Sequence, residues 1–387
     1  MIVNAIMPDQ LGGLQRYVRE LAGAIVARGV PVTVLAKRVM PETPRYERAD
    51  DGVELRRFDV PERSHPLYAA AYPLASLRAV ARSISATDGT VHVHYPLQGA
   101  PAALLGVPYL HTFHAPIHRE LLPEHRDRYA LPGALRGSLV AVARAGERLV
   151  ATRARATIVL TSYMRGQLAD LSPAAAHRAQ TIPSGIDGEH FSPGPGIDHP
   201  VAREGAPLLF TARRLVPRTG VSELVRAMPE IVAELPGARL AVAGDGPLAE
   251  EIRSLIRELS LAGSVFLLGR VSEADLVGWY RAANLFVLPT QELEGFGIST
   301  IEALACGTPV VGTPVGGTPE ILAAIDPRLL AAGPSPSELA AAVLGVTRPE
   351  GVLGALASRV RARVIPAMSW PTIADRHLEV YERMARG

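Results

Sequence analysis

The chain alternates between short apolar segments and helical segments, and it does so in two successive series. The first series runs from an apolar strand at 2–7 and a helix at 14–28 to a strand at 156–160. The second begins with a strand at 208–212 and ends with one at 309–312. Strands that alternate with helices build parallel sheets, because each helix carries the chain back to start the next strand. The sequence therefore predicts an α/β fold, and such sheets bind ligands beyond the carboxyl ends of their strands.

A stretch rich in proline and glycine separates the two series, and no helical or alternating period continues through it. A chain of 387 residues is also longer than a single hydrophobic core usually supports. We expect two Rossmann-like domains at 1–183 and 207–368, joined by a linker at 184–206. A last helix at 369–387 has apolar residues at helical spacing and is expected to cross back to the first domain.

Charge and cysteine content exclude several function classes. The formal net charge is only +2 and no block of five like charges occurs, which argues against a nucleic-acid partner. Cys306 is the only cysteine, so one chain can build neither a disulfide nor a cysteine zinc site, and its apolar neighbours predict a small buried side chain. The N-terminus lacks the basic start of a signal peptide, and the apolar runs are too short for a membrane span. We expect a cytoplasmic protein.

Two carboxylates stand eight residues apart in the segment EGFGISTIE, which runs from Glu294 to Glu302 and closely follows an expected strand. On one helix they would lie about 12 Å apart, a separation that suits the opposite ends of a nucleotide sugar. Glycines let the backbone approach a ligand closely, and the amides of Phe296, Gly297 and Ile298 at the start of the helix attract negative charge. The alternative is a pair of solvated helix carboxylates.

This segment resembles glycosyltransferase family 4, because the E-x7-E pattern is followed by G-x-P-V-V at 307–311. The resemblance extends over nearly the whole chain. It implies the GT-B fold, in which two Rossmann-like domains face each other across a cleft, the first binding the acceptor and the second the nucleotide sugar. It also implies that Glu302 holds the ribose hydroxyls, while Glu294 and the amides of Phe296 and Gly297 contact the transferred sugar.

An arginine-rich segment, TARRLVPRTG at 211–220, follows the first strand of the second domain. Guanidinium groups there can neutralise the diphosphate that departs during glycosyl transfer. Family members usually carry G-R-L, three further residues and K-G here, so Arg214 matches the family arginine. The glycine position holds Arg213 and the lysine position holds Thr219, which leaves Arg213 or Arg218 to replace the lysine. The alternative is a set of ordinary surface arginines.

Further candidate donor contacts come from glycine turns. Gly12 and Gly13 lie between a strand and a helix and resemble the family's N-terminal glycine loop, although a glycine pair is also an ordinary turn. The GDGP turn that starts at Gly244 lacks the third glycine of an NAD fingerprint, and the resemblance places it near the donor. The resemblance also gives Arg270 and Val271 backbone contacts to the nucleobase.

Histidines gather in the first domain, at His92, His94, His111, His114, His118 and His125. His92 and His94 would share one face of a strand, so a metal site is an alternative, but no HxxE or convergent carboxylate pattern accompanies them. Pro116 argues against a helix that would pair His114 with His118. By the resemblance, His114 lies beside the reacting sugar, and hydrogen-bonded core or rim positions suit His92, His118 and His125 better. We expect no metal and no cofactor apart from the nucleotide-sugar donor.

Other activities of the GT-B fold fit the sequence less well. Glycogen-type phosphorylases need a lysine for pyridoxal phosphate in the second domain, and Lys37 is the only lysine in the chain. An epimerase does not explain Arg214 together with the segment from Glu294 to Glu302. A metal-dependent hydrolase that uses the histidines, and a nucleotide-sugar sensor without catalysis, remain alternatives from other classes.

The family resemblance implies transfer with retention of anomeric configuration. The donor diphosphate would act as the base, while Arg214 and helix amides stabilise its developing charge. We expect a UDP-sugar donor and a small polyhydroxylated acceptor of antibiotic or other secondary metabolism, such as an aminocyclitol. A glycolipid or polysaccharide of the cell envelope is the alternative acceptor. With such an acceptor, the basic amphipathic stretch at 132–152 would lie on a membrane, but we favour an ordinary domain helix.

Overall fold

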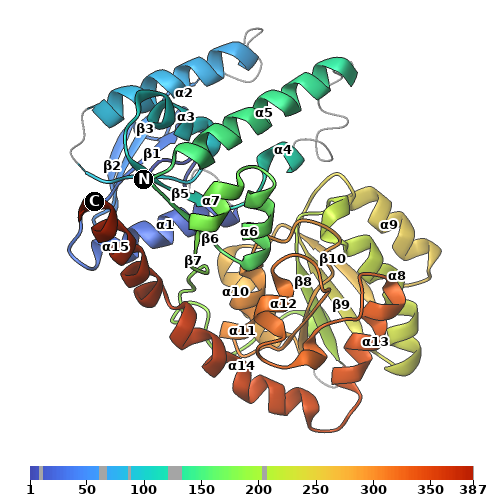
Figure 1. Cartoon of the computed structure of the whole chain (residues 1–387). Coiled ribbons are helices and arrows are strands. Elements are labelled where there is room, and N and C mark those ends of the chain that lie inside the picture. Colours follow the sequence, from blue (N-terminus) through green and yellow to red (C-terminus); the bar gives the residue numbers. More distant parts are fainter. Residues whose placement is uncertain (8–11, 61–67, 86–88, 121–132, 203–206, 387) are drawn as a thin grey trace. The chain divides into compact units, whose positions relative to one another are not determined.

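The computed structural model describes residues 1–7, 12–60, 68–85, 89–120, 133–202 and 207–386 (Figure 1). The chain forms two compact units. The first contains residues 1–185 and 370–387, and the second contains residues 186–369. The chain therefore passes from one unit to the other twice, and most of the segment expected as a linker, from residue 186 onward, belongs to the second unit.

The first unit combines a mostly parallel sheet with helices. Its elements are α1 (Gly13–Val26), β1 (Thr33–Lys37), β2 (Tyr46–Arg48), β3 (Glu54–Phe58), α2 (Tyr68–Ser85), β4 (Val91–Val93), α3 (Pro96–Leu105), β5 (Tyr109–Phe113), α4 (Ile117–Glu120), α5 (Gly133–Arg153), β6 (Ala156–Val159), α6 (Ser162–Ala169), α7 (Pro173–Arg178), β7 (Gln180–Thr181) and α15 (Trp370–Arg386). The strands pair in the orders β1-β3-β2 and β4-β5-β6-β7. Among the described strands of this unit, β2 alone pairs antiparallel.

The first residues of the chain join these two sets of strands. Ile2 forms parallel bridges to Leu35 in β1 and to Val93 in β4. The expectation of a strand over 2–7 is therefore wrong in extent, because the pairing fades at a long hydrogen bond of 3.4 Å from the Lys37 amide to the Asn4 carbonyl. Helix α1 is the next described element, and it starts at Gly13.

Side chains from opposite ends of the chain meet inside the first unit, where α1 and α15 pack side by side (Figure 1). The His377 Nδ1 atom lies 2.8 Å from the Ile373 carbonyl, which can only accept, so Nδ1 carries the proton. The Tyr17 hydroxyl therefore donates to His377 Nε2 at 3.1 Å. His92 Nδ1 pairs with the Tyr381 hydroxyl at 2.7 Å. These bonds fix α15 to α1 and β4.

The histidines of this region are packed in their neutral form. Burial lowers the pKa of His111 and His377 to about 4 and the pKa of His114 to about 3. Burial also holds the pKa of His92 and His94 well below its usual value, and the neighbouring histidines act in the same direction. A proton added to any of them would be a buried charge, which is unfavourable without a counter-charge.

The second unit is an open parallel sheet covered on both faces. Its elements are β8 (Leu208–Ala212), α8 (Val221–Glu234), β9 (Arg239–Ala243), α9 (Ala249–Glu258), β10 (Val265–Gly269), α10 (Glu273–Ala282), β11 (Leu285–Leu288), α11 (Ile298–Ala305), β12 (Val310–Gly312), α12 (Thr318–Leu322), α13 (Pro336–Thr347) and α14 (Val352–Met368). The strand order is β10-β9-β8-β11-β12. The chain builds outward from β8 through β9 to β10, then returns to place β11 on the other side of β8. This reversal makes the space between β8 and β11 the switch point of the sheet.

Loops at the carboxyl end of this sheet cross one another in direct backbone contact. Gly220, which ends the loop after β8, has φ of 71°, and a Cβ atom there would lie 1.8 Å from the Pro289 carbonyl oxygen after β11. Gly244, after β9, has φ of 136°, and its Cβ would lie 1.8 Å from the Arg213 carbonyl oxygen. Only glycine permits contacts this close, so these residues hold the loops of β8, β9 and β11 together.

Across the described ranges, no single helix has both the length and the apolar composition of a membrane span. Helices α13 and α14 pass that test only as a pair, and the pair is bent by 93°.

We expect Gly220→Ala to lower the free energy of unfolding by about 3 kcal/mol or more, because the new methyl group overlaps the Pro289 carbonyl and φ is positive. The measurement is urea or thermal unfolding. Gly345→Ala is the matched control, since it lies in α13 of the same unit with nothing within 4 Å, and it should gain about 0.5–1 kcal/mol. Equal stabilities for the two variants would contradict the close packing of these loops.

The neutral histidines predict a loss of stability in weak acid. Their stabilising effect is fully present above about pH 6.5, the value for histidine in the unfolded chain, and declines as the pH falls toward about 4. The decline reaches about 1.4 kcal/mol per pH unit for each histidine, because the unfolded chain binds protons that the folded chain excludes. Urea unfolding between about pH 7.5 and about pH 5 measures it. His377→Gln should show a shallower decline, and a wild-type stability that is flat over this range would contradict the assignment.

Candidate functional site

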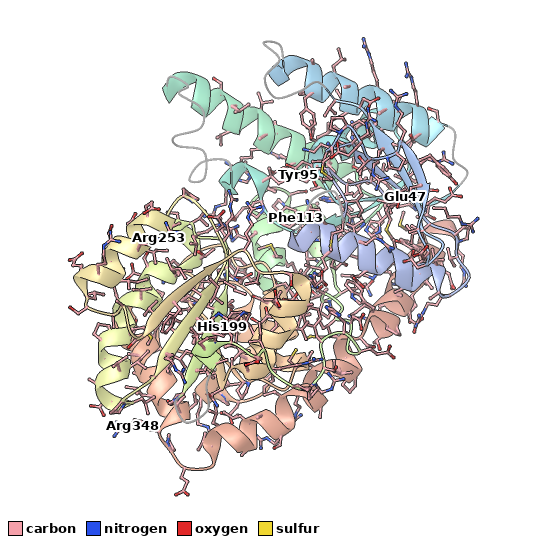
Figure 2. The ribbon with its side chains drawn as sticks, turned by 180° about the vertical axis from the view of Figure 1, so that it is seen from behind. Glu47, Tyr95, Phe113, His199, Arg253 and Arg348 are labelled. Carbon is pink, nitrogen blue, oxygen red and sulfur yellow. The ribbon has the colours of Figure 1, made fainter. Side chains whose placement is uncertain are left out.

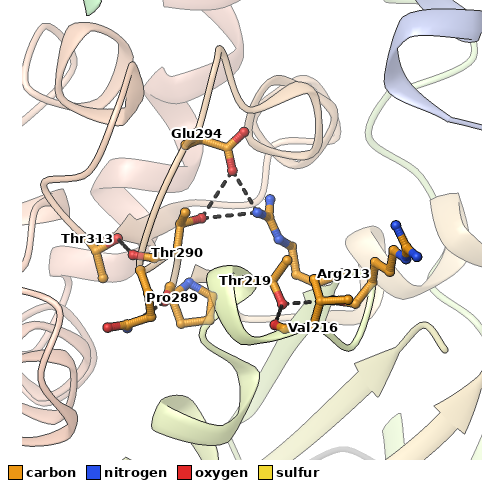
Figure 3. A network of polar contacts seen from close by, with 9 residues as sticks. Arg213, Val216, Thr219, Pro289, Thr290, Glu294 and Thr313 are labelled. Carbon is orange, nitrogen blue, oxygen red and sulfur yellow. Dashed lines mark hydrogen bonds and ion pairs between the residues drawn. The ribbon is translucent and has the colours of Figure 1, made fainter. Parts of the chain in front are cut away.

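Arg213 and Glu294 form a shielded ion pair at the switch point of the second sheet (Figure 3). Arg213 follows β8 and Glu294 lies in the loop after β11. The Arg213 Nη2 atom donates to Glu294 Oε2 at 2.7 Å and to the Thr290 hydroxyl at 3.1 Å, and that hydroxyl donates to Glu294 Oε2, also at 3.1 Å. The two loops expected to bind the donor are therefore joined by a closed ring of three polar side chains.

The expectation that both carboxylates of the E-x7-E segment lie on one helix is wrong. Helix α11 begins at Ile298, because Gly297 adopts a left-handed conformation with φ of 85°. Glu294 therefore stands on the loop before the helix, and the helical separation of about 12 Å does not apply to it. Gly297 is the N-cap residue of α11 and has no side chain, so no side-chain cap occupies the first amides of this helix.

Glu302 lies on α11 and is 6% exposed. The hydroxyl of Tyr280, on α10, donates to Glu302 Oε2 at 2.8 Å and orients the carboxylate. The Thr300 hydroxyl on the same helix is buried without a hydrogen-bond partner in the described part of the chain. Phe296, which precedes the helix, is packed in the interior, so its backbone rather than its ring is suited to a ligand.

Thr219, at the position where family members carry lysine, is turned into its own loop. Its hydroxyl lies within hydrogen-bonding distance of the carbonyls of Arg214 and Val216, at 2.7 and 2.8 Å, so its one hydrogen is shared between them or given to either, and the residue is 3% exposed. Arg214 is exposed and Arg218 is half-buried. Positive charge near this loop therefore comes from these two arginines, since the Arg213 guanidinium is turned to Glu294.

The remaining candidates of the second unit border the same loops. Gly244 packs on the Arg213 backbone, so the GDGP turn has a structural reason for its first glycine. Arg270 follows β10, has a side chain that is 86% exposed, and forms an ion pair with Asp245 at 3.5 Å. Val271 is half-buried beside it. Each of these residues therefore lies after the carboxyl end of β9 or β10.

The first unit gathers its own candidates at the carboxyl edge of its sheet, which Phe113 and Tyr95 mark in Figure 2. Gly12 directly precedes α1, which starts at Gly13. One turn into this helix, the buried Tyr17 ring meets the His114 ring edge-on, with centroids 4.8 Å apart. His114 follows β5, and its Nε2 atom lies 3.2 Å from His94 Nδ1. The glycine turn and His114 are thus brought together through Tyr17.

The other histidines of the first unit differ in whether their ring nitrogens have a partner. Within the described residues no group of three or more His, Cys, Asp or Glu side chains is arranged to hold a metal ion. His118 Nδ1 pairs with Glu147 Oε2 at 2.7 Å, and burial raises the pKa of that carboxyl group. His94 Nε2 and His111 Nδ1 are buried and find no partner in the described ranges. His125 lies outside the described residues.

Sequence reasoning did not identify Tyr17, Tyr280 and Thr290, which shape the site, and it considered His94 only as part of a possible histidine metal site. Most of their partners are far away in sequence. Tyr280 stands 22 residues before Glu302, whereas Thr290 contacts both the nearby Glu294 and the distant Arg213. Tyr17 and His377 are separated by 360 residues. A local pattern carries no signal for such long-range contacts. Thr290, however, follows the β11 strand and Pro289 directly, so its place at a strand end was a signal that the sequence offered.

Comparison with known proteins covers both units. The family described as glycosyl transferases group 1 matches residues 198–351, and the glycosyl transferase 4-like domain matches residues 12–185. The chain is 31% identical to a D-inositol 3-phosphate glycosyltransferase of Acidothermus cellulolyticus, over 96% of this chain and 85% of that one. It is 28% identical to a GDP-mannose-dependent alpha-(1-6)-phosphatidylinositol monomannoside mannosyltransferase of Mycobacterium tuberculosis, over 97% and 95% of the two chains.

Solved structures agree in fold. Sucrose-phosphate synthase from Thermosynechococcus elongatus superposes with a TM-score of 0.79 at 23% identity, over 100% of this chain and 98% of that one. Anabaena HepE in complex with UDP-glucose superposes with a TM-score of 0.72 at 16% identity, over 99% of each chain. The prediction of a GT-B fold is confirmed. The chain therefore belongs to glycosyltransferase family 4, a family of retaining GT-B enzymes.

Proposed function

We propose that the protein transfers a sugar from a UDP-sugar to a hydroxyl group of a cyclitol acceptor, with the donor held by the second unit. The observation that carries the donor assignment is the arrangement at the switch point between β8 and β11. There a buried carboxylate, Glu302, follows the uncapped start of α11, and α8 starts directly after the arginine-bearing loop. Helix N-termini and arginines bind phosphate, and a buried carboxylate suits a ribose diol.

Each group has a role in this proposal. Glu302, oriented by Tyr280, accepts hydrogen bonds from the ribose hydroxyls. Glu294 and the amides of Phe296 and Gly297 contact the transferred sugar, as the family resemblance implies. The family resemblance also implies roles for residues of the first unit. Gly12 and Gly13 would contact the donor phosphates and sugar, and His114 would lie beside the reacting sugar. Gly244, Arg270 and Val271 border the nucleobase.

The proposed reaction retains the anomeric configuration. The acceptor hydroxyl attacks the anomeric carbon on the face that the diphosphate leaves, the C1–O bond to the diphosphate breaks, and the departing phosphate oxygen takes the hydroxyl proton. Arg214, Arg218 and the first amides of α8 and α11 stabilise the negative charge that gathers on the diphosphate. This arrangement supplies the neutralisation without a metal ion.

The acceptor class is argued from the relatives. The two relatives named above act, by their names, on D-inositol 3-phosphate and on a phosphatidylinositol mannoside. An inositol ring is common to both, and it is a small polyhydroxylated ring like the aminocyclitol expected from the sequence. We infer a soluble cyclitol or cyclitol phosphate as acceptor, with a cyclitol lipid as the alternative.

A screen of donors and acceptors tests this function. Thermal shift with UDP-, GDP- and ADP-sugars should select a UDP-sugar, and nucleotide release should then require a cyclitol acceptor. D-inositol 3-phosphate in solution and vesicles that contain phosphatidylinositol separate the two acceptor classes. Turnover should persist in EDTA, which would abolish a metal-dependent hydrolysis. Absence of binding to every sugar nucleotide would contradict the proposal, and binding without turnover on any acceptor would favour a sensor.

Removal of the Glu302 carboxylate should weaken the donor. We expect Glu302→Gln to raise the Kd of UDP and of the selected UDP-sugar by the same factor, about 10-fold or more, because a charged hydrogen bond to the ribose is lost in both ligands. Calorimetric titration measures both constants. Glu251→Gln, on the exposed first turn of α9 in the same unit, is the matched control and should change neither. Wild-type affinity in Glu302→Gln would contradict its assignment to the ribose.

A further inference from the structure

Arg213 occupies a position where the family resemblance leads one to expect glycine, and its side chain has a defined place. Figure 3 shows the guanidinium group turned from the end of β8 toward the loop after β11. One nitrogen, Nη2, makes both contacts, to Glu294 at 2.7 Å and to Thr290 at 3.1 Å. The arginine thus reaches across the switch point instead of pointing into solvent as a surface arginine would.

The pair is shielded, which makes it different from an exposed ion pair. The Arg213 side chain is 10% exposed and the Glu294 side chain is 12% exposed. Charges taken out of water must be compensated by each other and by further hydrogen bonds, and Thr290, fully buried, provides the additional bond. Removal of either partner leaves the other charge shielded and uncompensated, so the orientation of each depends on the other.

The backbone around Glu294 is fixed as well. The Gly317 amide, after β12, donates to the Glu294 carbonyl at 2.9 Å. Thr290 is held in turn, because the Thr313 hydroxyl donates to its carbonyl at 2.6 Å. The backbone of Glu294 and its Oε2 atom are therefore both held by hydrogen bonds, and only its second carboxylate oxygen, Oε1, is left to bind a ligand. Its Oε1 atom and the Arg213 Nε and Nη1 atoms have no partner among the described residues.

Open α/β sheets bind ligands at the point where this pair lies. Oε1 of an ionised carboxylate can only accept, and the free guanidinium nitrogens can only donate. A sugar with two neighbouring hydroxyl groups satisfies both, since one hydroxyl donates to Glu294 while the next accepts from Arg213. A nucleoside diphosphate that lacks the transferred sugar offers no such pair of hydroxyl groups at this position.

We propose that Arg213 is a positioning and specificity residue that fixes Glu294 and, together with it, reads two adjacent hydroxyl groups of the donor sugar. This inference rests on the proposed function, because it assigns Glu294 to the transferred sugar. It gives Arg213 a role distinct from phosphate binding, which remains with Arg214 and Arg218. A hexose donor with free vicinal hydroxyls is the sugar class that fits.

The test compares the binding of a nucleoside diphosphate with the binding of the same nucleotide carrying the transferred sugar. Calorimetric titration gives the Kd of UDP and of UDP-glucose, or of the nucleotide and hexose derivative that the donor screen selects. In Arg213→Met we expect the Kd of UDP to stay within about 3-fold of wild type, while the Kd of UDP-glucose rises by about 10-fold or more. Arg213→Lys keeps the charge but not the fork of nitrogens, and should lie between. Arg253→Met, on exposed α9 (Figure 2), is the matched control and should change neither constant.

Glu294→Gln and the double variant Arg213→Met/Glu294→Gln complete the cycle. If the two side chains act together, the double variant discriminates UDP-glucose from UDP no worse than either single variant. Circular dichroism and melting of each variant separate loss of fold from loss of discrimination, and Arg213→Lys replaces Arg213→Met if the latter does not fold.

The outcomes are distinguishable. An equal loss of UDP and UDP-glucose affinity in Arg213→Met would overturn the inference in favour of a phosphate contact. Wild-type discrimination in that variant would overturn it in favour of a structural ion pair. A wild-type enzyme that binds no sugar nucleotide would contradict the proposed function itself, and the inference with it.

Discussion

The architecture of the candidate donor site depends on backbone contact between the loops that follow β8, β9 and β11. Glycine at 220 and 244 lets these loops cross at distances that any side chain would prevent. The crossing brings Arg213 and Glu294, which are 81 residues apart in the chain, to hydrogen-bonding distance. Because β8 and β11 are parallel, α8 and α11 also start at this end of the sheet. A sheet with the same strands but wider loops would carry the same residues without assembling them.

The first unit is organised by a different principle, the packing of neutral rings. The rings of His94 and His114, which follow β4 and β5, and the ring of His377 in α15 contact Tyr17 at tilted or edge-on angles. Tyrosine hydroxyls form hydrogen bonds with His92 and His377. Such a layer is specific because each ring needs a particular tautomer and a particular partner. The candidate site of the second unit contains an ion pair, whereas the region around His114 in the first unit is uncharged.

Much of this fold could be predicted from the sequence, since strands such as 208–212, 239–243 and 285–288 are continuous apolar runs between helical segments. The short strands β2 and β7 carry no such signal. Within the candidate site, the E-x7-E motif indicates Glu294 and Glu302, whose roles are proposals. The motif does not predict that a left-handed Gly297 leaves Glu294 on the loop before α11, and the sequence does not predict that Thr219 turns inward. The pairings of Arg213 and of the histidines are long-range contacts, which a local pattern cannot encode.

The route of the chain has a consequence for its biosynthesis. Residues 186–369 are contiguous, so the second unit is complete on the ribosome before the last helix has been made. The first unit is not, because Tyr17 and His92 receive their partners, His377 and Tyr381, only when the final residues emerge. Domains generally fold as units during synthesis, so the half made first is the half that finishes last. A nascent chain stopped short of α15 therefore exposes the ring layer of its N-terminal half to solvent and to quality control.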